Sequence, residues 1–278
     1  MYKKLAVKAR ALSLISIFKA GSGHPGGTLS CIDVVTYLFQ KEMNFDILNF
    51  DLKERDRFIL SKGHCAPALY AIGAIVGIME ESRLNGLRKI NHELQGHTCR
   101  TTTPWVEAST GSLAQGFSFA IGEAKGMKIQ NIQNRIYVMV GDGELQEGQI
   151  WEGAMFAAHH KLDNLCAIID YNKMQSDDLN ENIMGLEPLA DKWASFGWNV
   201  ITINGHDFTE IESAFNIARS CQQKPTVIIS NTIKGKGVSY MEGVPTWHGS
   251  AKLTVEDITK ALSELDYSHN DILGVTNV

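Results

Sequence analysis

Cysteines are few in this sequence and lie far apart. Only five occur among 278 residues, and no two of them form a CxxC pair. The odd number and the wide spacing argue against a disulfide framework and against a structural zinc site. Free cysteines are typical of a reducing compartment, so we expect the chain to work in the cytoplasm.

The sequence also lacks a long hydrophobic run and an excess of basic residues. Its longest nearly apolar stretch, APALYAIGAIVGIM, is shorter than the ~20 residues that a membrane-spanning helix needs. The N-terminal stretch MYKKLAVKARALSLISIFKAG resembles a weak signal peptide, but its apolar residues recur at helical spacing and favour an amphipathic helix. A formal net charge of −5 gives no support for nucleic acid binding. We therefore expect neither a membrane nor a nucleic acid as a partner.

No linker-like segment divides the chain, which predicts a single domain over 1–278. In the second half, short Val- and Ile-rich runs alternate with helix-like segments. The runs lie at 135–140, 165–170, 199–203 and 226–230, and the helix-like segments at 148–161, 187–196 and 207–222. The first half reads as mostly helical, over 3–20, 28–42, 66–79, 80–94 and 112–128. The alternation predicts an α/β fold, a doubly wound parallel sheet with helices on both faces.

One carboxylate stands between two glycines at the end of an expected strand. Asp142 occupies this place in YVMVGDG, and Asn172 ends the next expected strand in IIDYNKMQ. Because ligands bind beyond the carboxyl ends of parallel strands, we expect the two side chains to converge there. Their hard oxygen atoms favour Mg²⁺ or Ca²⁺ over zinc, and Mg²⁺ usually takes its remaining ligands from phosphate and water. The pattern predicts a Mg²⁺-bridged diphosphate; for GDG alone, a plain turn with Asp142 as a helix cap is the alternative.

The longer segment GDGELQEGQIWEGAMFAAHHKLDNLCAIIDYNKMQ resembles the thiamine diphosphate element of the transketolase family. The resemblance implies thiamine diphosphate and Mg²⁺ as cofactors, with Ca²⁺ or Mn²⁺ able to substitute. It implies that the side chains of Asp142 and Asn172 and the backbone carbonyl of Met174 bind the metal. Gly143 would contact the diphosphate.

Four histidines lie in glycine-rich loops, namely His24, His64, His97 and His248. Each one alone is more often a surface or capping residue, but four together indicate anion binding or proton transfer. The adjacent His159 and His160 cannot share one helix face, and we assign them no role.

The motifs around these histidines, SGHPGG, RDRFILSKGH and STGSLAQGFSFAIGEAKG, also resemble transketolases. By this resemblance, the catalytic residues that line the sugar channel are His24, His97 and His248. The residues implied to contact the cofactor are His64, Gly111, Ser112, Leu113, Lys234 and His248.

Glu147 and Glu152 match acidic positions at the subunit interface of transketolases, and we group Glu147 with the cofactor residues. A solvated helix face is the alternative for both. The segment SDDLNENIMGLEPL departs from the commoner IDG version, which leaves the loop at 176–186 without a predicted conformation.

The resemblance covers about the first half of a full transketolase and lacks the pyrimidine-binding domain, whose glutamate activates the cofactor. It therefore implies the N-terminal subunit of a split transketolase, working with a C-terminal partner chain in an α2β2 heterotetramer. The implied reaction moves a two-carbon ketol unit from a ketose or ketose phosphate to an aldose or aldose phosphate, as in the pentose phosphate reactions of carbohydrate metabolism.

Two other readings stay open at the level of the sequence. One is another thiamine diphosphate enzyme, similar to deoxyxylulose-phosphate synthase or to the α subunit of a 2-oxoacid dehydrogenase. The other is a non-catalytic module that binds Mg²⁺ and diphosphate. The set of loop histidines favours the transketolase reading over both, since neither needs sugar-channel imidazoles.

Overall fold

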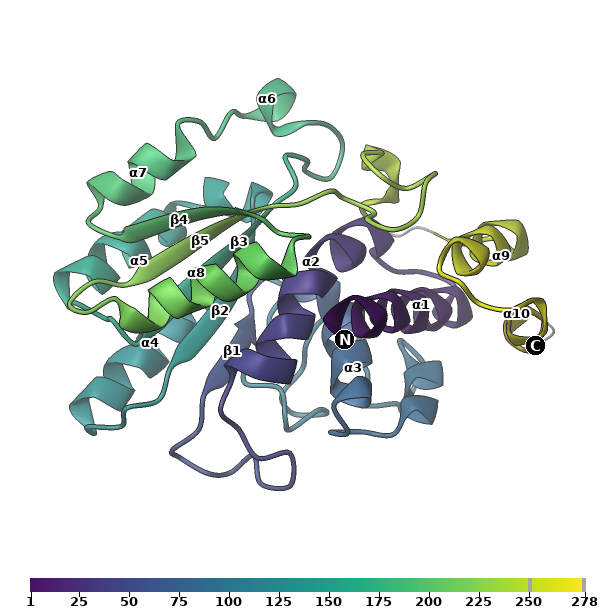
Figure 1. The fold of residues 1–278 in the computed structure, drawn as a ribbon, viewed down its shortest axis with the longest axis horizontal. Coiled ribbons are helices and arrows are strands. Elements are labelled where there is room, and N and C mark those ends of the chain that lie inside the picture. Colours follow the sequence, from purple (N-terminus) through teal and green to yellow (C-terminus); the bar gives the residue numbers. More distant parts are fainter. Residues whose placement is uncertain (250–251, 277–278) are drawn as a thin grey trace.

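The computed structural model of the chain describes residues 1–249 and 252–276. At its centre lies a five-stranded, all-parallel sheet with the strand order β1-β2-β3-β5-β4 (Figure 1). The strands are β1 (Arg57–Leu60), β2 (Ile136–Gly141), β3 (Leu165–Tyr171), β4 (Asn199–Asn204) and β5 (Thr226–Asn231). Every residue of β2 and β3 is buried, as expected for apolar strands that are covered on both faces.

Successive side chains of the central strands point into two separate hydrophobic cores. Tyr137 and Met139 of β2 belong to one core, and Val138 and Val140 belong to the other. The first core is shared with α1 (Tyr2–Ala20), α2 (Pro25–Tyr37), α3 (Ala66–Ile75) and α8 (Phe208–Ser220). The second core is shared with α4 (Gln115–Ile129), α5 (Gly148–His159) and α7 (Leu189–Ser195). Figure 1 shows α8 and α4 on opposite sides of the sheet, which confirms the predicted doubly wound α/β fold.

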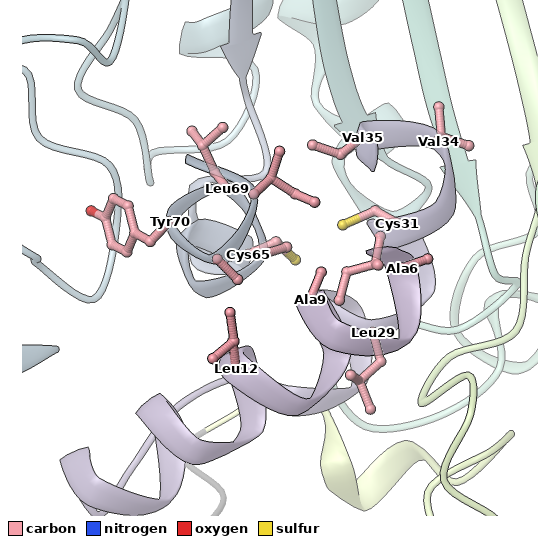
Figure 2. Close-up of a cluster of buried hydrophobic side chains, with 14 of the residues drawn as sticks. Ala6, Ala9, Leu12, Leu29, Cys31, Val34, Val35, Cys65, Leu69 and Tyr70 are labelled. Atoms are coloured by element: carbon pink, nitrogen blue, oxygen red, sulfur yellow. The ribbon is translucent and has the colours of Figure 1, made fainter. Parts of the chain in front are cut away.

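The first three helices pack against one another beside the sheet. Figure 2 shows side chains of α1, α2 and the start of α3 gathered around a common interior, among them Ala9, Leu29 and Leu69. The small side chain of Ala9 lets α1 approach its neighbours closely. This packing holds the start of α2, which follows His24, in a fixed place relative to the sheet.

The remaining helices of the described residues are short or lie near the end of the chain. They are α6 (Asn180–Ile183), α9 (Val255–Glu264) and α10 (His269–Thr276). None of the helices in the described ranges has both the length and the apolar character that crossing a bilayer requires.

One prediction for the first half of the chain was wrong, and one strand there was not predicted. No α-helix covers 80–94: a 3₁₀ turn at Glu81–Gly86 is followed by turns in which Arg88 and Asn91 adopt positive φ values of 57° and 61°, which a helix cannot contain. The run at 57–60, to which the sequence analysis assigned no element, forms the edge strand β1. Four residues are too few to show the alternating pattern of a strand in the sequence. The strand is stabilised by its pairing with β2.

Candidate active site

A cavity of about 240 Å³ lies at the carboxyl ends of β2 and β3. Most of the residues singled out from the sequence line it, although their motifs are spread along the whole chain. These are His24, His64, His97, Gly111, Leu113, Asp142, Gly143, Asn172, Met174, Lys234 and His248. The side chains of Ser112 and Glu147 are exposed and lie outside this lining, as does the exposed Glu152.

The two strand-end oxygen donors are brought together by strand pairing. Gly141 of β2 lies opposite Asp170 of β3, so Asp142 and Asn172 follow neighbouring strands and line the same cavity. The side chain of Asp142 accepts hydrogen bonds from the backbone N–H of Gly143 (2.9 Å) and from Nδ2 of Asn180 (3.0 Å). Burial, with a further contribution from the nearby Asp170 carboxylate, raises the pKa of Asp142 to about 6. A cation at this place would offset that cost of burying the carboxylate.

Asn180 comes from the segment whose conformation the sequence left open. A bridge between Met174 and Leu179 folds this segment back, and α6 then begins at Asn180. The amide of Asn172 bends the chain next to it, because its Oδ1 accepts from the N–H of Met174 (3.1 Å). The 176–186 segment therefore helps to orient Asp142, which no sequence pattern indicated.

Two buried lysines line the cavity. Lys62 is paired with Asp170 and also donates to the carbonyl oxygen of Gly27 (3.3 Å). Burial by itself lowers the pKa of Lys62, but the charge of Asp170 outweighs it and raises this pKa well above its ordinary value. Lys234 has no carboxylate partner among the described ion pairs, and burial lowers its pKa to about 8. Both lysines line the cavity and offer N–H donors to an anion.

The four loop histidines form one cluster. The ring centroid of His24 lies 5.3 Å from that of His64, 5.8 Å from that of His97 and 6.0 Å from that of His248. Burial and the neighbouring His64 lower the pKa of His24 to about 4, and burial and Lys234 lower that of His248 to about 3. The pKa of His97 is also lowered, mainly by burial. The lowered pKa values favour the neutral forms of His24, His97 and His248, in which each imidazole can donate one hydrogen bond and accept another.

Glycine is required at position 111 of the cavity lining. Gly111 has a φ of 144°, a conformation that side-chain-bearing residues rarely adopt. A Cβ atom there would lie 3.0 Å from Cδ2 of His97. The absence of a side chain therefore lets the STGS loop pass directly beside an imidazole of the cluster.

Sequence reasoning missed Glu144, which holds three loops of the site together. Its buried carboxylate accepts from the hydroxyl of Ser61, the backbone N–H of Ala114 (2.8 Å) and the backbone N–H of Gly141 (3.0 Å). Burial raises the pKa of Glu144. Its place two residues after Asp142 was visible in GDGEL, but nothing local showed that its partners lie in the SKGH and STGS motifs.

Gly27, Lys62, Gln175 and Ser176 are further lining residues that the sequence did not single out. Lys62 lies within RDRFILSKGH, a motif in which only His64 was assigned a role from the sequence. The residues next to a lysine in the sequence do not show whether its side chain is buried or exposed.

Comparison with known proteins decides the family. The model of the family described as transketolase, thiamine diphosphate binding domain, matches residues 1–275. The chain belongs to this family. It carries the thiamine diphosphate binding domain of transketolases, as the motifs predicted.

Two relatives are themselves named as subunits. The chain is 46% identical over 257 residues to the 6-deoxy-6-sulfo-D-fructose transketolase subunit SqwG of Clostridium sp. (strain MSTE9), covering 92% of this chain and 93% of the relative. It is 39% identical over 254 residues to an apulose-4-phosphate transketolase subunit of Phocaeicola vulgatus, covering 90% and 88%. The chain therefore spans most of the length of these two transketolase subunits.

A solved transketolase from Campylobacter jejuni shares the fold, with a TM-score of 0.89 and 32% identity over 96% of this chain. The chain spans only 43% of that protein, less than half of its length. The similarity is thus to one part of a larger enzyme.

Proposed function

We propose that this chain is the diphosphate-binding subunit of a two-chain transketolase. It would transfer a two-carbon ketol unit from a ketose or ketose phosphate to an aldose or aldose phosphate, with thiamine diphosphate and Mg²⁺. The observation that carries the proposal is the single cavity in which strand-end oxygen donors, two lysines and four imidazoles meet. Family membership and the similarity to two named subunits support it.

The chemistry of the donor set fits magnesium. Among the described residues, no three His, Cys, Asp or Glu side chains gather in a way that would hold a metal by themselves. One carboxylate with an amide and a carbonyl oxygen instead suits a hard cation that takes its other ligands from phosphate and water. Asp142, Asn172 and the carbonyl of Met174 are the proposed ligands, and Ca²⁺ or Mn²⁺ could take the place of Mg²⁺.

Donors for the diphosphate lie on the same wall. Gly143 brings a backbone without a side chain to the cavity, and Lys234 offers a buried ammonium group. We assign His64 and the 111–113 stretch to the same cofactor, with Ser112 acting through its backbone. When bound, thiamine diphosphate supplies the nucleophilic ring carbon that attacks the ketose carbonyl.

The neutral imidazoles are the proposed partners of the sugar oxygens. The ammonium group of Lys234 can only donate, so Nδ1 of His248 accepts from it (2.8 Å) and the ring proton of His248 resides on Nε2. His248 can therefore donate from Nε2 to a substrate oxygen. His24 lines the cavity, and its Nδ1 is buried without a hydrogen-bond partner. We assign His97, next to His24, to the same channel.

The proposed partner is a C-terminal transketolase subunit that carries the pyrimidine-binding domain, in an α2β2 assembly located in the cytoplasm. Phe119 on α4 and Met155 and Phe156 on α5 expose large apolar side chains, and we assign them to the interface with that partner. Glu147 and Glu152, at the start of α5 and exposed, are assigned to the same interface.

Two-chain reconstitution tests the proposal. The chain is co-expressed with the product of the neighbouring reading frame, and two-carbon transfer is assayed with thiamine diphosphate, Mg²⁺ and a panel of ketoses. The panel includes 6-deoxy-6-sulfo-D-fructose and apulose 4-phosphate, the compounds in the names of the two relatives. We expect transfer to an aldose only when both chains are present. Release of CO₂ from a 2-oxoacid, or no transfer from any ketose, would contradict the proposal.

A further inference from the structure

We propose that Asp33 and His206 are positioning residues that hold Lys234 in the cavity through the 232–237 loop. The inference deepens the proposed function and rests on it, because Lys234 is assigned there to the diphosphate. Neither Asp33 nor His206 lines the cavity.

A chain of hydrogen bonds runs from α2 to the residue before Lys234. Nδ1 of His206 lies 2.7 Å from Oδ2 of Asp33, and Nε2 of His206 accepts from the backbone N–H of Ile233 (2.9 Å). Since Nε2 must accept from a backbone N–H, the ring proton lies on Nδ1 and is donated to Asp33. The carboxylate thus selects the tautomer of His206 that can hold the backbone of the loop.

A second contact holds the other side of the loop. Arg10 of α1 donates to both carboxylate oxygens of Asp33 (3.1 and 2.5 Å), and its Nε donates to the carbonyl oxygen of Lys236 (2.9 Å). Arg10 and Asp33 are each only 5% exposed, and the side chain of His206 is 11% exposed. The loop is therefore held on both sides of Lys234, at Ile233 and at Lys236, by one network centred on the buried pair Arg10 and Asp33.

The path of the Lys234 side chain is narrow, so the position of the loop matters. The N–H of Gly235 donates to the carbonyl oxygen of Gly26 (2.9 Å), and a Cβ atom on Gly26 would lie 3.0 Å from Cγ of Lys234. At the far end, Nζ of Lys234 donates to the carbonyl oxygen of Gln175 (2.6 Å). A shift of the loop backbone would carry the ammonium group away from the place where an anion meets it.

The test separates a positioning role from a purely structural one. In the full chain, His206→Ala is compared with His206→Gln, whose amide keeps one donor and one acceptor, and with His269→Ala, an exposed histidine on α10. Hydrogen exchange of the 232–237 peptide is measured against that of β3 and β5. Binding of inorganic pyrophosphate in the presence of Mg²⁺ is measured by calorimetry.

We expect His206→Ala to speed exchange in the 232–237 peptide while leaving the strands protected. We expect it to weaken pyrophosphate binding about ten-fold, the scale of one lost charged hydrogen bond. His206→Gln should recover most of the affinity, and His269→Ala should match the wild type. Combining His206→Ala with Lys234→Ala should cost no more than Lys234→Ala alone, because both changes remove the same contact.

Unchanged loop exchange and unchanged affinity in His206→Ala would overturn the inference, as would losses that simply add to those of Lys234→Ala. Should His206→Ala fail to fold, His206→Asn takes its place, because it keeps a donor for Asp33 and is too short to reach Ile233. If the wild-type chain binds no pyrophosphate, the proposed function fails, and hydrogen exchange alone then decides whether the network holds the loop.

Discussion

Asp142 and Asn172 follow neighbouring parallel strands, and both line one cavity at the carboxyl ends of those strands. Thirty positions separate them in the sequence, and the pairing of β2 with β3 removes that separation. The cofactor proposal depends on this relationship, because the proposed metal would take its protein ligands from both strand ends.

The first prediction concerns the proposed metal ligand. Asp142→Ala should weaken Mg²⁺-dependent binding of thiamine diphosphate by at least about 100-fold, because it removes the carboxylate among the ligands. Calorimetric titrations with and without Mg²⁺ measure this, and thermal unfolding shows that the fold persists. Asp177→Ala, at an exposed acid of the adjacent loop, is the matched control. Equal cofactor affinity in Asp142→Ala and wild type would rule out the metal assignment.

The second prediction concerns pH and His24. The pKa of His24 is lowered from 6.5 to about 4, chiefly by burial, so its neutral form is favoured in the folded chain. This contribution to stability is fully present above pH 6.5 and is lost as the pH falls toward 4. Urea midpoints at pH 7.5 and pH 5 should therefore differ less in His24→Gln than in wild type. His269→Gln should behave like wild type, and parallel pH profiles for all three proteins would show that His24 is not the buried neutral group.

The third prediction concerns the carboxylate that joins three loops. Glu144→Ala leaves Ser61, Ala114 and Gly141 with donors that have lost their acceptor. We expect the free energy of unfolding to fall by about 3 kcal/mol, measured in urea, because buried unsatisfied donors are costly. Glu147→Ala, an exposed glutamate nearby, should change it by less than about 0.5 kcal/mol. A similar small change in both variants would contradict the role of Glu144.

The fourth prediction compares substitutions at two glycines, Gly111 and Gly122, whose surroundings differ. Gly111→Ala should lower the free energy of unfolding by about 1–2 kcal/mol, because its backbone conformation is strained for alanine and the new Cβ atom meets His97. Gly122 lies within α4, and a Cβ atom there meets nothing within 4 Å. Gly122→Ala should therefore stabilise the chain by about 0.5–1 kcal/mol in the same urea experiment. Stabilisation by both changes would show that the loop at Gly111 adapts.

Local sequence patterns were enough to predict the strands in the second half of the chain. The apolar runs that became β2 to β5 are long enough to show their character, and all four strands form close to their predicted bounds. The metal and histidine motifs could be recognised for a related reason. GDG, SKGH and WHG each place glycine next to a residue that can bind a metal or transfer a proton. Such signals depend on neighbours within a few positions, and the sequence displays those directly.

Other features exist only because the chain folds back on itself. The four residues of β1 become a strand by pairing with β2, and Glu144 bonds to Ala114 across 30 positions. Asp33 and His206 meet across 173 positions. The sequence alone determined four of the five strands, the family motifs and the residue types of the site, because periodicity and turn chemistry are local. Only the tertiary structure decided which polar groups satisfy one another in the interior, because a buried donor takes whichever acceptor the packing of helices and strands brings within reach.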